Sequence, residues 1–188
     1  MKRENQHRKE KRTKKLPRAA LAQWLSFTKK DWTLIGKDTD SMSTSMNPDI
    51  EQKQNVLGET VTEHKGFKPE LAVDSYAART EDAIYENLLD ITMNRKFDEA
   101  STTAYLLEGV LDEAVAESDN KTLLGKGWME EVTVVPQEYG GGMEAFGIPF
   151  NVSPKGGGRE KGTVSVTKRV PTFTPDPDQG AGTESGTE

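Results

Sequence analysis

Apolar residues in this sequence occur in short runs that mostly alternate with polar residues and end at glycine or proline. Alternation with a period of two is typical of strands that have one face in a core and the other in water. The 17 glycines and nine prolines among the 188 residues supply turns between such strands. The longest uninterrupted apolar runs have four or five residues, far short of the ~20 that span a bilayer. The sequence therefore predicts a mainly β protein with no membrane span.

The alternating runs predict a series of strands separated by turns. The first two would cover residues 22–28 and 32–35. Because Pro17 suits the first turn of a helix, a helix over residues 17–27 is the alternative. The remaining predicted strands cover residues 40–46, 59–64, 70–77, 102–111, 129–135, 145–152 and 162–167.

Glycine-rich segments punctuate the second half of the chain. Residues 140–142 and 154–158 are expected to form hairpin loops. Residues 112–127 are first acidic and then glycine-rich, which favours a loop, with a helical turn over 112–118 as the alternative. From Pro171 onward the sequence is rich in Pro, Asp, Gly and Thr and is expected to be flexible.

One helix is expected, over about residues 81–96. Thr80 is a candidate N-cap, and the acidic residues that follow it suit the first turn of a helix. Arg95 and Lys96 bring the complementary charge to the last turn. One face carries an apolar stripe, formed by Ile84, Tyr85, Leu88, Leu89 and Ile91. The stripe predicts a helix that packs on a sheet, so the expected fold is α+β but mainly β: an antiparallel β-sandwich or small barrel with one flanking helix.

The polar segment at about residues 47–63 is too long for an ordinary turn. Loops longer than ~12–15 residues without structure of their own are usually functional or disordered. Strand-like runs flank this segment, so a long projecting hairpin is expected, with a loose surface loop as the alternative. Its few apolar side chains would then need a partner surface. The candidate inter-subunit contacts are Asn47, Pro48, Ile50, Val56, Leu57 and Val61.

The charge distribution divides the chain into three parts. Residues 1–18 carry nine Lys or Arg and two Glu, a net charge of +7, which leaves −13 on the rest of a chain whose total is −6. We expect a flexible basic arm at 1–18, a β-sandwich domain at 19–174 and a flexible acidic tail at 175–188. The candidate electrostatic residues of the arm are Lys2, Arg3, Arg8, Lys9, Lys11, Arg12, Lys14 and Lys15. Such an arm can bind nucleic acid, contact the acidic body of a neighbouring copy, or remain a solvated tail.

No residue pattern in the chain predicts catalysis, a cofactor or a metal. With no Cys, thiolate ligands and Cys nucleophiles are excluded, and a zinc site or a triad would depend on His64, because His7 lies in the arm. Residues 140–145 match a loose dinucleotide-binding pattern, and 157–163 resemble a phosphate-binding loop. Each is followed by strand-like sequence where the motif requires a helix, so turns are expected at both places.

The order of these features resembles the major tail protein, or tail tube protein, of long, non-contractile-tailed bacteriophages. The resemblance covers about residues 20–174. Its best part runs from Trp32-Thr-Leu-Ile-Gly36 to Met42-Ser-Thr-Ser-Met-Asn-Pro48, and the helix at 81–96 and the closing strand at 162–167 follow in order.

The resemblance implies a β-sandwich with a flanking helix, whose copies form six-membered rings that stack into a tube. The long hairpin would reach a neighbouring ring or subunit. DNA and the tape-measure protein would pass through the channel, and tail-terminator and distal tail proteins would be further partners. The location would be the virion tail, assembled in the cytoplasm of the host bacterium. The family has no catalytic residue to transfer.

Two alternatives remain at this point. One is a nucleic-acid-binding module that uses the basic arm. The other is the inner tube protein of a contractile tail or a phage-derived bacteriocin, which has a related fold.

Overall fold

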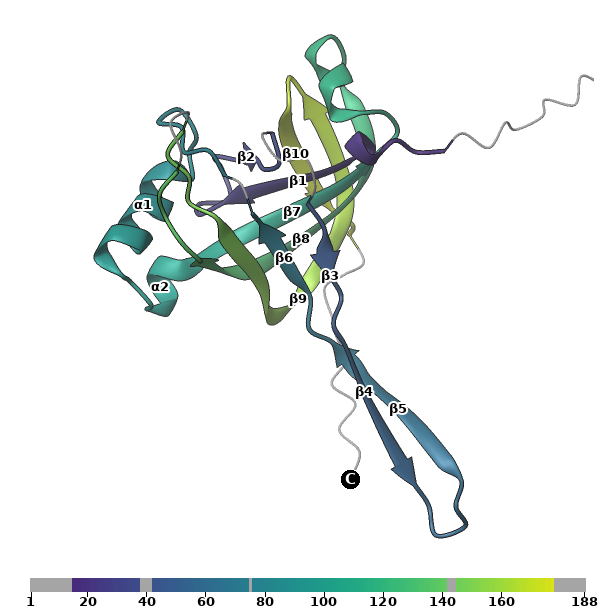
Figure 1. Cartoon of the computed structure of the whole chain (residues 1–188). Helices are drawn as coiled ribbons and strands as arrows, with labels where there is room; N and C mark the ends of the chain where they lie inside the picture. The colour runs from purple at the N-terminus through teal and green to yellow at the C-terminus, as the bar shows by residue number, and fades with distance from the viewer. Residues whose placement is uncertain (1–14, 38–41, 75, 142–144, 178–188) are drawn as a thin grey trace, which may run out of the picture.

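A computed structural model describes residues 15–37, 42–74, 76–141 and 145–177. The body is one antiparallel sheet of eight strands in the order β2-β1-β7-β8-β9-β6-β3, with β10 also paired to β9 (Figure 1). Its strands are β1 (Leu21–Ser26), β2 (Thr33–Leu34), β3 (Thr44–Ser45), β6 (Glu70–Val73), β7 (Thr103–Leu111), β8 (Leu123–Pro136), β9 (Phe150–Thr167) and β10 (Val170–Pro175). A separate hairpin consists of β4 (Pro48–Gln54) and β5 (Thr60–Phe67). The predicted fold class, mainly β and antiparallel with a projecting hairpin, is confirmed.

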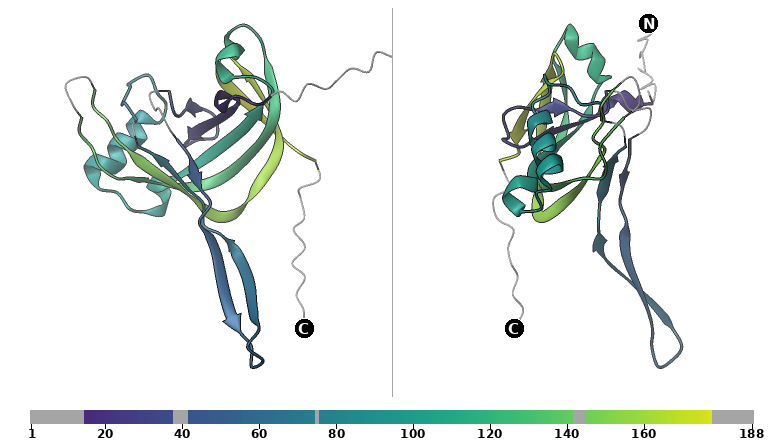
Figure 2. Two further views of the ribbon diagram at one scale, coloured as in Figure 1. Left: turned by 45° about the vertical axis from the view of Figure 1, so that its right-hand side comes forward. Right: turned by 60° about the vertical axis from the view of Figure 1, so that its left-hand side comes forward.

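Strands β8 and β9 are long, and β9 bends so that the sheet curls (Figure 2). The first part of β9 pairs with β6 and its last part pairs with β10, while β8 lies beside both parts. The register between β8 and β9 changes from Glu130↔Arg159 to Val132↔Pro154, a step of two residues on β8 against five on β9. The glycine-rich residues 155–158 are therefore a bulge inside a strand, and such bulges bend strands. The predicted hairpin loop at 154–158 is wrong.

The sheet has a hydrophobic core on each face. Trp24 and Leu25 are adjacent in β1, and their cross-strand partners Leu107 and Leu106 are adjacent in β7, so the two pairs point to opposite faces. The first core contains Leu25, Ile35, Leu71, Val73, Tyr76, Ile84, Leu88, Ala104, Leu106, Val132, Val134, Ile148, Phe150 and Val152. The second contains Ala22, Trp24, Leu107, Leu111, Leu123, Val164 and Val166.

A row of small residues crosses the sheet on the face of the second core. Ala22, Gly109, Gly127 and Gly162 are successive cross-strand neighbours on β1, β7, β8 and β9. Aromatic rings occupy the space that side chains would otherwise take. A Cβ on Gly109 would lie 3.1 Å from Trp24 Cζ3, and one on Gly162 would lie 2.9 Å from Phe173 Cε2. These glycines therefore allow close packing on a strand and do not mark turns.

Helix α1 (Tyr85–Asn94) covers the first core through Leu88 and Ile91, as its apolar stripe predicts. It begins four residues later than expected, and Thr80 is not its cap. The reason is Asp82, which accepts a hydrogen bond from the Tyr76 hydroxyl at 3.1 Å and pairs with Lys37 at 3.6 Å. These tertiary contacts hold residues 80–84 in turns.

Shorter helical segments flank the strands. They are η1 (Arg18–Ala20), α2 (Glu99–Thr102) and η2 (Val115–Asp119). The alternative helix over 17–27 is thus wrong apart from its first turn, while the alternative helical turn within 112–118 is close to η2. Helix α2 is not predicted from the sequence, although Asp98 caps it by accepting a hydrogen bond from Ser101 N at 2.9 Å.

Several predicted boundaries are also wrong. Strand β3 is two residues long, with residues 38–41 outside the described parts of the chain, and β6 ends at Val73. Strand β8 begins at Leu123, inside the predicted loop at 112–127, and β9 begins at Phe150 instead of residue 145. Beyond Pro171, predicted to be flexible, the chain forms β10 on the edge of β9, whereas residues 178–188 are not described.

Candidate assembly surfaces

The hairpin of β4 and β5 stands away from the body in every view (Figures 1 and 2). Among the described strands, β4 and β5 pair with each other and with no other strand. At the base, Lys68 N donates to the carbonyls of Met46 at 3.2 Å and Asn47 at 3.1 Å, and Asn47 Nδ2 donates back to Lys68 O at 3.2 Å. The predicted projection at 47–63 is confirmed and extends to Phe67.

The turn at the tip of the hairpin is fixed by Asn55. Its side-chain oxygen accepts hydrogen bonds from Leu57 N at 3.0 Å and Glu59 N at 2.9 Å. Its Nδ2 donates to the Glu59 carboxylate at 2.8 Å, and Gly58 has a positive φ of 80°. This turn holds the side chains of Val56 and Leu57 in solvent, with exposed fractions of 102% and 80%. The tip is thus ordered by its own hydrogen bonds and needs no partner surface to form.

One face of the hairpin carries its charges, in a chain of ion pairs. Lys53 Nζ lies 3.4 Å from the Glu51 carboxylate and 3.3 Å from that of Glu63. Lys65 also pairs with Glu51. Cross-strand neighbours share a face, and Glu51 is directly opposite Glu63. All these groups are exposed enough that each pair stabilises the hairpin only slightly.

The opposite face carries no Asp, Glu, Lys or Arg. The cross-strand pairs Ile50↔His64 and Pro48↔Phe67 lie there, followed toward the tip by Gln and Thr side chains. The rings of His64 and Phe67 meet edge to face, with centroids 4.5 Å apart. Ile50 and Phe67 are nevertheless 55% and 54% exposed. We call this the uncharged face; an exposed apolar strip with polar flanks is typical of an interaction surface.

The structure separates the predicted contact residues into four groups. Pro48 and Ile50 lie on the uncharged face, and Val56 and Leu57 form the tip. Val61 is opposite Lys53, on the charged face. Asn47 is at the base, with a φ of 40°, and its side chain is used within the chain.

Phe67 belongs to the uncharged face but is missing from the sequence-based set. Phe67 lies beyond the predicted segment at 47–63, and a register shift of the hairpin beside Gly66 determines the face on which it lies. Of the candidate residues of the basic arm, Lys15 is described and exposed. The other seven lie outside the described residues.

The curled sheet leaves outer edges open. Strands β2 and β3, at the two ends of the strand order, do not pair with each other. Strand β2 pairs with β1 over two residues, and β3 pairs with β6 over two residues. Strand β10 has β9 on one side and no described strand on the other. Open edges carry unpaired backbone donors and acceptors that another copy can satisfy.

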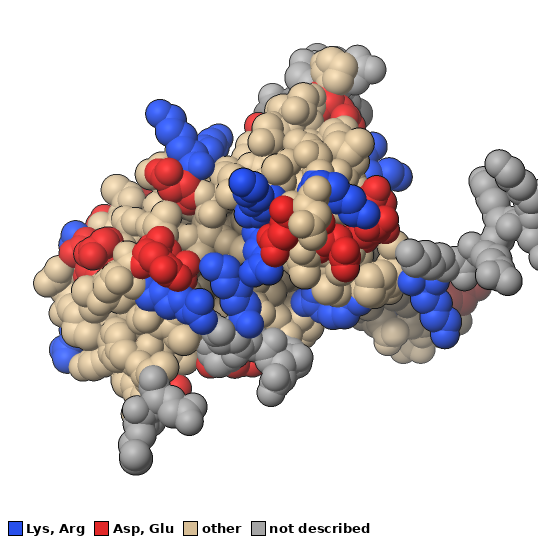
Figure 3. All heavy atoms as spheres, turned by 90° about the horizontal axis from the view of Figure 1, so that it is seen from above, with Lys and Arg blue, Asp and Glu red and all other residues tan. Residues whose placement is uncertain are grey.

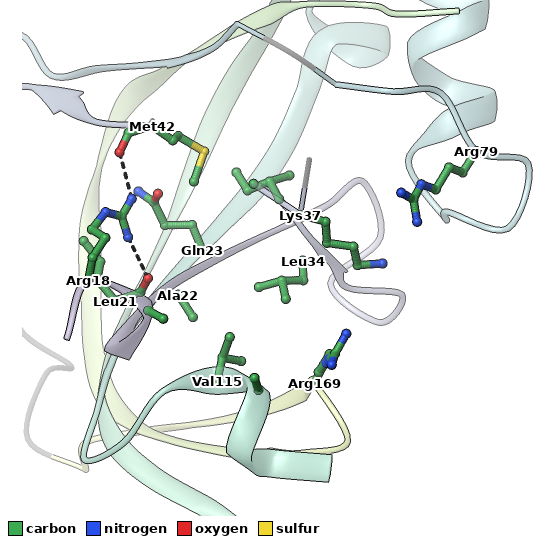
Figure 4. Close-up of a pocket in the computed structure, with 14 residues that line it drawn as sticks. Arg18, Leu21, Ala22, Gln23, Leu34, Lys37, Met42, Arg79, Val115 and Arg169 are labelled. Carbon is green, nitrogen blue, oxygen red and sulfur yellow. Dashed lines mark hydrogen bonds between the residues drawn. The ribbon is translucent and has the colours of Figure 1, made fainter. Parts of the chain in front are cut away.

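A cavity of about 620 Å³ near η1 and η2 is lined by Arg18, Lys37, Arg79 and Arg169, among others (Figure 4). These cations have partners within the chain. Arg18 donates to the carbonyls of Met42 at 2.7 Å and Leu21 at 3.0 Å, and Arg169 pairs with Asp119 at 3.0 Å. On the face seen in Figure 3, Lys and Arg are interspersed with Asp and Glu. The cavity therefore links neighbouring segments, and its cations are engaged in contacts within the chain.

A second charged cluster lies on the first-core face of the sheet, where β7, β8 and β9 meet. Arg159 pairs with Glu108 and, at 3.1 Å, with Glu130. Burial raises the pKa of Glu130 and lowers that of Arg159, although the ion pair between them acts in the opposite direction. The cluster is an internal polar network that joins three strands.

Among the described residues, no group of three His, Asp or Glu is placed to hold a metal ion. The described helices include none long and apolar enough to cross a membrane. No protein-family model and no curated protein matches the chain.

Proposed function

We propose that this protein is a structural subunit that assembles with copies of itself into stacked rings, which form the tail tube of a bacteriophage with a long, non-contractile tail. The observation that carries the proposal is the hairpin of β4 and β5, with an uncharged face and an apolar tip in solvent. The resemblance of residues 20–174 to tail tube proteins supplies the ring and the tube.

A projecting hairpin with these properties is costly for a chain that functions alone. An isolated two-stranded hairpin is marginally stable in water. Burying apolar surface contributes about 25 cal/mol per Å², so covering Ile50, Phe67 and the tip on another copy would stabilise the hairpin and the assembly together. The tip and the body surfaces are different, so the contact is heterologous. Such contacts close rings or extend filaments.

The remaining features are compatible with a tube. Open outer edges at β2, β3 and β10 allow strand pairing between copies within a ring. The net charge of −13 on residues 19–188 gives a wall of the same sign as DNA, which does not neutralise phosphates and lets the polymer slide. In this proposal DNA and the tape-measure protein pass through the channel without specific binding. Terminator and distal tail proteins meet the ends of the tube in the virion.

Removal of the hairpin tests the proposal. Because Asn47 O and Lys68 N are 3.1 Å apart, residues 48–67 can be replaced by a short Gly-Ser link without moving the body. We expect a folded monomer that forms no tubes in negative-stain electron microscopy. Tubes of normal length from this variant would contradict the proposal.

Matched surface variants separate the two faces of the hairpin. Ile50→Ser with Phe67→Ser should abolish tube formation, because both side chains lie on the uncharged face. Lys53→Ser with Glu63→Ser, on the charged face, should leave tubes intact. Equal loss in both pairs would show that the hairpin acts only through its own folding.

The basic arm supports one further candidate function, nucleic-acid binding, on the strength of its net charge of +7. This function predicts DNA affinity that falls steeply with salt and disappears when residues 2–18 are removed. A gel shift at two salt concentrations distinguishes it from self-assembly, which would survive high salt through its apolar contacts.

A further inference from the structure

An apolar groove of about 380 Å³ lies between the end of α1, α2 and the end of β8. Its lining includes the buried Ile91 and three exposed side chains. These are Phe97, Val135 and Tyr139, with exposed fractions of 94%, 46% and 59%. Pairing of β7 with β8 ends at Thr103↔Thr133. The last residues of β8 therefore have no neighbouring strand on that side among those described, which leaves room for another segment of chain.

The charges at the groove distinguish it from the other exposed apolar surfaces. Its charged lining residues are Arg95, Lys96 and Glu138. Lys96 is held by Asp90 at 2.6 Å, whereas Arg95 forms no ion pair with any residue in the described parts of the chain. The groove thus combines exposed aromatic rings with Arg95, a cation that has no ion-pair partner among the described residues, and with one carboxylate, Glu138.

The tip of the hairpin has the complementary properties. It is convex, it presents two exposed aliphatic side chains, Val56 and Leu57, and its one charged residue is Glu59. The Glu59 carboxylate accepts a hydrogen bond from Asn55 but pairs with no described cation. The turn hydrogen bonds order the tip in advance, so little conformational entropy is lost when it docks.

We infer that the groove beside Phe97 receives the hairpin tip of another copy, with Val56 and Leu57 against the aromatic rings and Glu59 near Arg95. This inference rests on the proposed self-assembly and names the surface that it uses. The hairpin and the groove are on separate parts of the molecule, and the tip points away from the body (Figure 1). The same chain therefore cannot fill its own groove, and each copy offers one tip and one groove, as a head-to-tail contact requires.

Disulfide cross-linking tests this contact directly, because the natural chain contains no Cys. A disulfide forms only where two Cα atoms come within about 7 Å. The full-length chain with Leu57→Cys and Phe97→Cys would be assembled under reducing conditions, oxidised, and separated on a non-reducing gel. We expect a ladder of covalent oligomers larger than dimers, since every copy would be joined to two neighbours. Each single-Cys variant would give dimers at most.

A matched control carries Leu57→Cys with Leu124→Cys, because Leu124 is an apolar residue on the body with an exposed fraction of 56%. It should give no ladder. Tubes that form without a 57–97 ladder, or a ladder of equal strength in the control, would overturn the groove assignment and leave the proposed function standing. Failure of the unmodified chain to assemble at any concentration would overturn both.

Charge reversal provides a second measurement that does not depend on cysteine chemistry. Glu59→Arg and Arg95→Glu should each reduce the yield of tubes, and the double variant should recover it. Loss in both single variants without recovery in the double variant would overturn the pairing of these two residues. Circular dichroism would confirm that each variant is folded.

Discussion

Replacement of Gly109 by alanine tests the row of small residues on the sheet. A Cβ at this position would lie 3.0 Å from Val164 Cγ1 and 3.1 Å from Trp24 Cζ3. Both neighbours are fully buried. Trp24 is further fixed by a hydrogen bond of 3.0 Å from its indole Nε1 to Arg169 O. Neither side chain has space into which it can move, so the added methyl group forces strain.

Two opposing effects set the size of the change. Overpacking a well-packed core costs about 1–3 kcal/mol. Alanine leaves the unfolded chain less conformational freedom than glycine does, which raises the free energy of unfolding by about 0.4–1 kcal/mol. We expect Gly109→Ala to lower the free energy of unfolding by about 1–2 kcal/mol, equivalent to roughly 2–8 °C in Tm for a chain of this size. Strand propensity alone predicts the opposite sign, because alanine suits a strand interior better than glycine does.

Urea unfolding followed by circular dichroism measures this change, at a protein concentration where light scattering shows no assembly. Gly157→Ala is the matched control, since a Cβ there would have nothing within 4 Å, and it should be neutral or slightly stabilising. A Gly109→Ala variant as stable as the natural protein, with an unchanged m-value, would refute the argument that the glycine row is required for packing.

Three further predictions concern α1, α2 and the hairpin tip. Leu88→Ala should lower the free energy of unfolding by about 2–5 kcal/mol because Leu88 is fully buried under the sheet; Met93→Ala, on the exposed side of the same helix, should change it by less than about 0.5 kcal/mol in the same urea assay. Hydrogen bonds from the Ser101 side chain and backbone hold the pKa of the Asp98 carboxyl below its ordinary value of 3.8. The charged carboxylate therefore stabilises the fold fully above pH 3.8, and this stabilisation is lost as the pH falls through the lower folded-state pKa. Asp98→Asn, which keeps a capping oxygen, should remove that share of the acid sensitivity when unfolding is compared at about pH 6 and about pH 3. Asn55→Ala should speed amide hydrogen exchange in the turn at residues 55–59, because the side-chain oxygen that accepts two of its backbone N–H groups is lost.

The fold class is predictable from this sequence because alternation fixes which residues face a core. Residues 22–28 and 102–111 are expected to be strands, and they contain β1 and β7, which pair with each other inside the sheet. The apolar stripe of α1 likewise identifies Leu88 and Ile91 as buried. These signals are local, and the structure confirms them.

Glycine is where local signals fail. A glycine at a turn, in a bulge or beneath an aromatic ring looks the same in sequence, because the common requirement is the absence of a Cβ. Gly156 and Gly158 have positive φ angles of 85° and 92° inside the β9 bulge, whereas Gly127 and Gly162 make room for Phe173. In the sequence, all these segments resemble loops or strand ends. The distinction depends on cross-strand neighbours that lie elsewhere in the chain.

The candidate site was predictable in part. The exposed aliphatic tip follows from the polar composition of residues 47–63, which cannot cover Val56 and Leu57. The sorting of the other residues onto two faces depends on the register of β4 with β5, including the shift between Asp49 and Ile50. Val61 shares a face with Glu63 by simple alternation. Phe67 would share that face too without the shift, so the sequence alone could not place Phe67 opposite the charges.

In the proposed assembly, the two faces of the hairpin would have different consequences. The exposed ion pairs contribute little to stability, but burying them against another copy would remove their solvation at a cost of several kcal/mol per ion. Docking through the charged face is therefore disfavoured, while docking through the uncharged face buries Ile50 and Phe67 at no such cost. Only one orientation of the hairpin then remains favourable. With one orientation at every contact, successive copies add in a single sense, and a stack built in this way has two different ends, as a tube that is attached at one end requires.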